Sequence, residues 1–277
     1  MSNQKVALIT GGTDGMGKAT AKKLLSEGWQ VVIIGRNPSK CDAAVTDLKN
    51  AAQNNEISAI VADLSLLSET RKACDSFLAQ HQTLDFLFLN ANAISQKRIL
   101  TSEGFESNFA LGFLSRALMS KKLEDVLKAT PGSQILTVVG LNTSKLDYDD
   151  LTMSRNYSSG RALGRWQWAT QVFSKKFNET SPVLMNIYMP GLVRTKILSN
   201  EPGPMRLMVK LMNLVIGISV EKSAENVFTV ITDIAQNKRK DAYYQWKELK
   251  PSPVLGVTSS DKQILWDLTE KLIKPYT

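Results

Sequence analysis

The sequence is poor in the residues that build disulfide frameworks and metal centres. Its 277 residues include two cysteines and one histidine. Cys41 and Cys74 lie in segments patterned as helices and lack metal-ligand spacing, so neither a disulfide framework nor a metal site is expected. His81 follows a third helical segment and is expected at the surface. These absences predict a protein of the cytoplasm whose chemistry uses no metal.

Long hydrophobic runs are also absent. The longest apolar stretch, residues 205–218, contains Arg206 and Lys210 and falls short of the roughly 20 residues that a membrane-spanning helix needs. The chain passes from a short polar lead directly into a strand pattern, so no secretion signal is predicted. Docking of 205–218 on a membrane surface, with the two cations at the interface, is a weaker alternative to a place inside the protein.

Concentrated charge is missing as well. The 34 Lys and Arg residues exceed the 26 Asp and Glu residues, which gives a net charge of +8. The cations are scattered, with one tight run at 237–240 and no interleaved aromatic residues, and this distribution argues against nucleic-acid binding. A solvated basic surface, part of which serves an anionic cofactor, accounts for the charge.

What the sequence has instead is a regular alternation of short β-branched runs and amphipathic stretches. Strands are predicted at residues 6–12, 30–35, 57–64, 84–91, 134–140, 183–189 and 241–246. Helices are predicted at residues 17–27, 41–52, 67–81, 105–127, 157–179 and 221–236. Near-continuous apolar strands separated by helices indicate a parallel sheet covered on both faces. The sequence therefore predicts an α/β fold, a single doubly wound, Rossmann-like domain over 1–277 with a parallel sheet of about seven strands flanked by helices.

A glycine-rich turn joins the first predicted strand to the first helix. It runs from Thr10 and Gly11 to Gly15, Met16 and Gly17. Such a turn lets backbone N–H groups approach a pyrophosphate at the positive end of the helix. Its position inside a βαβ unit predicts a dinucleotide site.

The ends of the next two strands indicate which dinucleotide binds. Where an NAD site would carry an acidic residue, Gly35 is followed by Arg36. A guanidinium suits a ribose 2′-phosphate, so NADP(H) is favoured over NAD(H). Asp63 and Leu64, after the third strand, are expected at the adenine edge.

At this point the sequence resembles the short-chain dehydrogenase/reductase family, most closely its retinol-dehydrogenase-like branch. The resemblance covers nearly the whole chain and rests on TGxxxGxG at 10–17, Asp63-Leu64, LNANA at 89–93, PGLVRT at 190–195, TSEGFESNF at 101–109, KLDYDDL at 145–151 and the tail from 241 to 277. The family's fourth-strand motif lies along the cofactor, which implies that role for Asn90 and Ala91. The PGxVxT motif implies contacts to the nicotinamide amide from Pro190, Gly191, Val193 and Thr195.

The resemblance also implies where the catalytic residues should be. The family transfers a hydride with a tyrosine as acid or base, a lysine one helical turn later, a serine after the fifth strand and an asparagine on the preceding helix. The corresponding positions here are Leu163, Gln167, Gly140 and Gly112. All four residue types are changed, so ordinary alcohol or ketone chemistry is not expected.

Two phenols remain as candidates for a replacement acid. Tyr188 lies two residues before the PG pair, and Tyr157 with Arg161 has a Y-x-x-x-basic spacing. A shifted alignment would make that pair the catalytic one, but it breaks the match on both sides. Of the tryptophans that flank Gln167, Trp168 is expected to pack, and Trp166 is left open between packing and lining the pocket.

These observations leave two functions in view. The favoured one is an atypical NADP(H)-binding enzyme, a reductase with a replacement acid or an isomerase or cyclase. A bulky apolar substrate under a methionine-rich lid at about 196–218 is one interpretation, and a core or interface helix is the other. The alternative function is an inactive relative that binds NADP(H) as a sensor or partner subunit. The resemblance further implies a homo-oligomer formed through the helices at 105–127 and 157–179.

Overall fold

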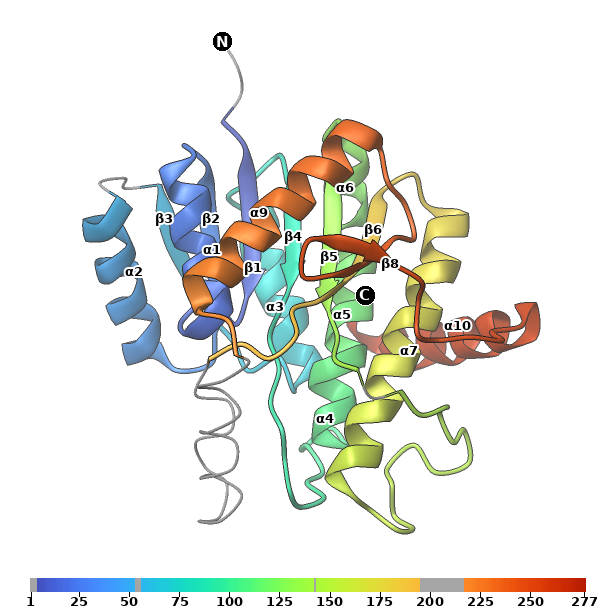
Figure 1. The fold of residues 1–277 in the computed structure, drawn as a ribbon. Helices are drawn as coiled ribbons and strands as arrows, with labels where there is room; N and C mark the ends of the chain where they lie inside the picture. The colour runs from blue at the N-terminus through green and yellow to red at the C-terminus, as the bar shows by residue number, and fades with distance from the viewer. Residues whose placement is uncertain (1–3, 53–55, 142, 195–216) are drawn as a thin grey trace.

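A single twisted sheet organises the protein. The computed structural model describes residues 4–52, 56–141, 143–194 and 217–277, and within them eight strands form one sheet in the order β3-β2-β1-β4-β5-β6-β7-β8 (Figure 1). The strands are β1 (Val6–Thr10), β2 (Gln30–Gly35), β3 (Ile57–Val61), β4 (Phe86–Leu89), β5 (Gln134–Val138), β6 (Leu184–Met189), β7 (Tyr243–Gln245) and β8 (Glu248–Lys250). Strands β1 to β7 pair in parallel, and β8 returns antiparallel to β7.

Helices cover both faces of this sheet. They are α1 (Gly15–Ser26), α2 (Pro38–Ala52), α3 (Leu67–Leu78), α4 (Ser107–Phe109), the π-helical turn η1 (Ala110–Leu114), α5 (Ser115–Lys122), α6 (Glu124–Ala129), α7 (Ser159–Thr180), α9 (Val220–Asn237), α10 (Ser259–Ile273) and the short 3₁₀ turn η3 (Lys274–Tyr276). One apolar layer packs α1, α2 and α9 against the sheet. The other packs α3, α5 and α7 against the opposite face.

The central strands β1 and β4 are buried because their residues are almost all apolar. All five residues of β1 and all four of β4 are buried, as expected where helices cover both faces of a parallel sheet. This confirms the predicted doubly wound α/β fold. The structure adds one short antiparallel strand, β8, to the seven that the sequence predicted.

The predicted continuous helix over 105–127 is wrong. It is divided into α4, η1 and α5, and α6 follows. Glu106 begins the series, and its carboxylate accepts hydrogen bonds from the backbone N–H groups of Asn108 and Phe109, both at 3.0 Å. The wider π-helical turn then rotates the following residues relative to a regular helix. This rotation decides which side chains of α5 face the sheet.

The C-terminal helix α10 packs across the outside of α5 and α7. The Trp266 ring stacks on Phe173 of α7 with the centroids 5.3 Å apart, and the ammonium of Lys121 from α5 lies 4.9 Å from the same ring. Self-association through α5 and α7 stays a prediction.

No helix in the described ranges combines the length and apolarity needed to cross a bilayer. The proposed lid at about 196–218, with Thr195 before it, lies outside the described residues except for its last two positions.

Candidate active site

The glycine turn after β1 is shaped for a close approach by a ligand. Gly11 has a φ of 66°, a conformation that favours glycine. A Cβ on Gly17 would lie 2.3 Å from the carbonyl oxygen of Gly11 and 2.6 Å from Nδ2 of Asn90. The first N–H groups of α1 have no partner within the helix, because an α-helix leaves its first turn unsatisfied. The turn therefore fits the pyrophosphate of a dinucleotide.

A hydrogen-bond network ties this turn to the end of β4. The Asn90 side-chain amide donates to the carbonyl oxygens of Thr10 (3.0 Å) and Gly11 (3.3 Å). The backbone N–H groups of Asn90 and Ala91 both donate to the Thr10 hydroxyl, at 2.8 and 2.9 Å. Thr10 is only 2% exposed. Thr10 and Asn90 thus hold the turn from behind, and the backbone of Ala91 lies beside Gly11.

The predicted residues for the adenine half follow β2 and β3. Arg36 is exposed directly after Gly35. The Asp63 carboxylate accepts hydrogen bonds from the backbone and hydroxyl of Ser65, at 2.9 and 2.7 Å. Leu64 is buried. Arg36 is therefore free to meet a 2′-phosphate, whereas one oxygen of Asp63 already shapes its own turn.

Two further predicted residues lie in or beside buried packing. Met16 is buried, and its sulfur accepts a hydrogen bond from the hydroxyl of Ser223 on α9 at 2.9 Å. Gly191 after β6 has a φ of 70°, and a Cβ there would lie 2.4 Å from Nε1 of Trp246.

The segment after β6 lies beside the segment that leads into α9. Val193 forms an isolated parallel bridge with Ile218. Pro190 precedes this bridge at the carboxyl end of β6 and is partly buried.

Where the resemblance implies an asparagine, Gly112 leaves room for a tryptophan. A Cβ on Gly112 would lie 2.4 Å from Cδ2 and 2.6 Å from Cγ of Trp166. Trp166 is 1% exposed, and the hydroxyl of Thr170, one turn later on α7, donates to the carbonyl oxygen of Gly112 at 3.2 Å. The indole thus fills the space over η1, and of the two interpretations of Trp166 the structure shows packing.

The positions expected for serine and lysine contact each other. The side-chain Oε1 of Gln167 accepts a hydrogen bond from the backbone N–H of Gly140 at 2.7 Å. Gln167 is 4% exposed, whereas Leu163, at the tyrosine position, is half-buried and packs against the same core. Trp168 is buried as expected. None of these side chains can give up a proton near neutral pH.

Sequence reasoning missed a buried arginine in this centre. Arg116 of α5 is 3% exposed. Its guanidinium donates to the hydroxyl of Thr137 and the carbonyl oxygen of Ala91, both at 2.9 Å, and to the carbonyl oxygen of Val138. It also lies 4.8 Å from the centroid of Trp166. Burial lowers the pKa of Arg116 to about 9. The sequence contains one signal for it, a cationic residue within the apolar run that forms η1 and α5.

The two candidate phenols lie in different places. The Tyr157 hydroxyl donates to the carbonyl oxygen of Ser95 at 2.8 Å and accepts from Nδ2 of Asn108 at 3.2 Å. Burial, followed by the charge of Glu106, raises the pKa of Tyr157. Tyr188 is fully buried in the layer of α1 and α9, across the sheet from α7. Tyr157 precedes α7, whereas Tyr188 lies on the other side of the sheet from that helix.

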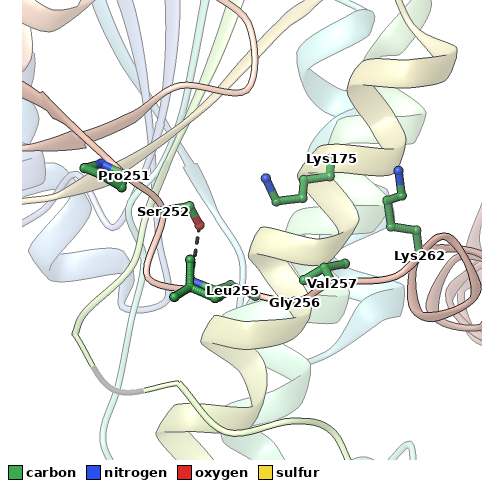
Figure 2. A pocket seen from close by; sticks show the side chains of 8 residues that line it. Lys175, Pro251, Ser252, Leu255, Gly256, Val257 and Lys262 are labelled. Atoms are coloured by element: carbon green, nitrogen blue, oxygen red, sulfur yellow. Dashed lines mark hydrogen bonds between the residues drawn. The ribbon is translucent and has the colours of Figure 1, made fainter.

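A surface hollow elsewhere is distinct from this centre. A hollow of about 340 Å³ lies between α7 and the segment 251–257 that precedes α10, and Figure 2 shows the side chains that line it. Its two lysines, Lys175 and Lys262, form ion pairs with Asp241 and Glu179. The hollow lies beside the C-terminal half of α7.

Comparison with known proteins agrees with this geometry. A sequence profile of the short chain dehydrogenase family matches residues 5–204. Human polyprenol dehydrogenase is 30% identical over 276 residues, which cover 95% of this chain and 83% of that protein. Human retinol dehydrogenase 13 is 29% identical over 199 residues, 70% of this chain and 60% of that protein. The structure of an alcohol dehydrogenase from the archaeon Thermococcus sibiricus, complexed with 5-hydroxy-NADP, aligns with a TM-score of 0.69 and 20% identity, covering 90% of this chain and all of that one.

Proposed function

Because the chain belongs to the short-chain dehydrogenase family, we propose that it binds NADP(H) and acts on a bulky apolar small molecule without the family's tyrosine. The observation that carries this proposal is the intact network of Thr10, Asn90 and Ala91 behind the glycine turn, next to a rebuilt centre at Gly140 and Gln167. A nicotinamide cofactor, when bound, supplies or accepts a hydride. The residues of the chain would hold the cofactor, orient the substrate and exclude water.

The preference for NADP(H) rests on Arg36. Its exposed guanidinium follows β2, and Asn37 comes next, so no carboxylate stands where ribose hydroxyls would need one. An arginine can bind a phosphate through two parallel charged hydrogen bonds.

The apolar substrate rests on the named relatives and on exposed side chains at the same edge of the sheet. Relatives of this chain carry the names polyprenol dehydrogenase and retinol dehydrogenase. In this chain Leu141 is 71% exposed after β5, and Ile99 is 51% exposed in the segment after β4. Apolar side chains at the carboxyl ends of these strands suit an apolar ligand, because ligands of such sheets bind at that edge. The reaction is either a reduction with a replacement acid such as Tyr157 or an isomerisation or cyclisation in a shaped site.

A second candidate is an inactive relative that binds NADP(H) as a sensor or partner subunit. It is favoured by the Trp166 ring, which fills the space over Gly112. It predicts that NADPH stabilises the protein by about 2.7 kcal/mol at a hundredfold excess over Kd, with no turnover. For either candidate we propose a cytoplasmic protein.

Calorimetric titration of the full chain with NADPH and with NADH tests the shared part of both candidates. Micromolar binding of NADPH and much weaker binding of NADH is expected, and Gly17→Ala should abolish both. If the unaltered chain binds neither cofactor, the proposed function is wrong.

Turnover separates the two candidates. The chain is incubated with NADPH and an apolar aldehyde or ketone, such as retinal, and with NADP⁺ and a polyprenol, and products are followed by chromatography. Turnover that survives Tyr157→Phe supports a route without that phenol. Turnover that disappears in Tyr157→Phe identifies Tyr157 as the acid and favours the shifted alignment. Cofactor binding with no product from any probe favours the inactive relative.

A further inference from the structure

Arg116 is a buried cation without a counter-charge in the described ranges. It forms no ion pair there, its Nε has no hydrogen-bond partner, and its three acceptors are two backbone carbonyls and a hydroxyl. Removing an unpaired charge from water costs several kcal/mol. Three neutral hydrogen bonds and the face of Trp166 offset only part of this cost.

A second buried arginine in the same region has carboxylates near enough to act on its charge. Arg165 of α7 is also 3% exposed, and its guanidinium lies 5.4 Å from the Phe109 ring. Burial lowers the pKa of Arg165, and the negative charges of Glu106 and Asp150 oppose that shift. For Arg116, burial is the sole cause of the pKa shift, which agrees with the absence of a nearby carboxylate in the described residues.

The acceptors of Arg116 place its charge within the dinucleotide crevice. In a sheet of this order, a dinucleotide lies across the reversal between β1 and β4, with one nucleotide half on each side. Arg36 follows β2 and marks the adenine half. The carbonyl groups of Ala91 and Val138 lie at the carboxyl ends of β4 and β5. Arg116 therefore lies beneath the other half, where the nicotinamide ring belongs.

The surrounding side chains fix the guanidinium in this position. Hydrogen bonds to β4 and β5 hold one side, and the indole of Trp166, seated over Gly112, covers the other. A charge held in this way keeps its field where a flexible surface lysine would lose it to solvent.

We propose that Arg116 determines the redox preference of the cofactor site, because its fixed positive charge disfavours the cationic ring of NADP⁺ and leaves the neutral ring of NADPH unaffected. This inference rests on the proposed binding of NADP(H) and deepens it. At an effective permittivity of about 20, a fixed unit charge beneath the ring is expected to change this equilibrium by roughly tenfold or more. The chain should hold the reduced cofactor and work in the direction of reduction, or sense NADPH.

The test measures the ratio of two dissociation constants. The full chain and the variants Arg116→Gln and Arg165→Gln are titrated calorimetrically with NADPH, with NADP⁺ and with adenosine 2′,5′-bisphosphate, which lacks the nicotinamide. NADPH should bind the unaltered chain at least about tenfold more tightly than NADP⁺. Arg116→Gln should bring this ratio close to one and leave the affinity for the bisphosphate unchanged. Arg165→Gln removes an equally buried arginine from the neighbouring helix and should leave the ratio as it was.

The outcomes separate this inference from the proposed function. Equal binding of NADPH and NADP⁺ by the unaltered chain overturns the role of Arg116, even if the variant does not fold. A ratio that survives Arg116→Gln, or that Arg165→Gln abolishes as well, also overturns it. If the unaltered chain binds none of the three ligands, the proposed NADP(H) site itself is wrong.

Discussion

The Trp166 ring occupies the space that a side chain at Gly112 would need. The effect of Gly112→Ala on the free energy of unfolding should therefore change sign when the ring is removed. In the unaltered chain, Gly112→Ala places a Cβ 2.4 Å from Cδ2 of the indole. The ring is 1% exposed, so it cannot move into solvent to make room. Overpacking of this kind costs about 1–3 kcal/mol, and we expect Gly112→Ala to lower the free energy of unfolding by that amount.

Removing the ring should reverse the effect. Trp166→Ala alone should cost about 3–5 kcal/mol, because it leaves a cavity in the core. In that background the Cβ at position 112 meets no ring, and alanine is favoured over glycine in a helix by about 1 kcal/mol. Gly112→Ala should therefore stabilise the Trp166→Ala variant, and the coupling between the two positions should be about 2–4 kcal/mol.

Urea unfolding of the four proteins, followed by circular dichroism, measures this cycle. The midpoints should shift without a change in the urea dependence, which would show that the folded state remains as compact. If Gly112→Ala is neutral or stabilising in the unaltered chain, the indole does not occupy the space over η1, and the rebuilt centre is wrong.

Three further predictions follow from the cofactor turn and the buried acids. Arg36→Asp should weaken NADPH binding by about tenfold to a hundredfold, the value of one or two charged hydrogen bonds, and should spare NADH; equal losses for both cofactors would argue against a 2′-phosphate contact. Gly17→Ala should remove binding of both cofactors in calorimetry, because the Cβ meets the glycine turn at 2.3 Å, whereas Gly28→Ala, with nothing within 4 Å of its Cβ, should leave binding intact. Burial raises the pKa values of Cys74 and Tyr188 to about 12; the unfolded chain then loses these protons first, so stability should fall above about pH 9 for Cys74 and above about pH 10 for Tyr188, by up to about 1.4 kcal/mol per pH unit for each group. Cys74→Ala should make that fall shallower in unfolding measured from pH 8 to 11, and an unchanged slope would contradict the buried thiol.

The layers of the fold could be predicted because each strand is an apolar segment bounded by turn residues. Residues 6–10 and 86–89 are buried on both sides, and burial on both faces leaves an uninterrupted apolar signature. The eighth strand has no such signature. Glu248–Lys250 is exposed along its length and is defined by its pairing with β7, which no local pattern encodes.

The interruption of the helix over 105–127 was also beyond the sequence pattern. An amphipathic pattern counted over the whole stretch does not show where a π-helical turn inserts one extra residue. At the turn Ala110–Leu114, Trp166 from α7 lies over Gly112. That contact joins segments more than fifty residues apart.

The candidate site could be predicted where it depends on backbone shape. Gly11 is required by its positive φ and Gly17 by its contact with the carbonyl of Gly11, and the spacing of the two is visible in the sequence. From the sequence, the change at the catalytic positions could be recognised only as the absence of the four expected residue types. The sequence did not reveal that the loss at Gly112 makes room for Trp166, or that Arg116 lies under the same ring. Both depend on the packing of η1 and α5 against α7.

The two large side chains of this centre call for different explanations. Trp166 restores the volume that a glycine at 112 leaves open, and a filled core explains it without any reference to a ligand. Arg116 cannot be explained in that way, because an apolar side chain of similar size would fill the same space without removing a charge from water. Its hydrogen bonds end on the carbonyl groups of Ala91 and Val138, at the strand ends where the crevice receives its ligand. Packing stability explains Trp166, whereas the proposed electrostatic effect on a cofactor bound in the crevice explains Arg116.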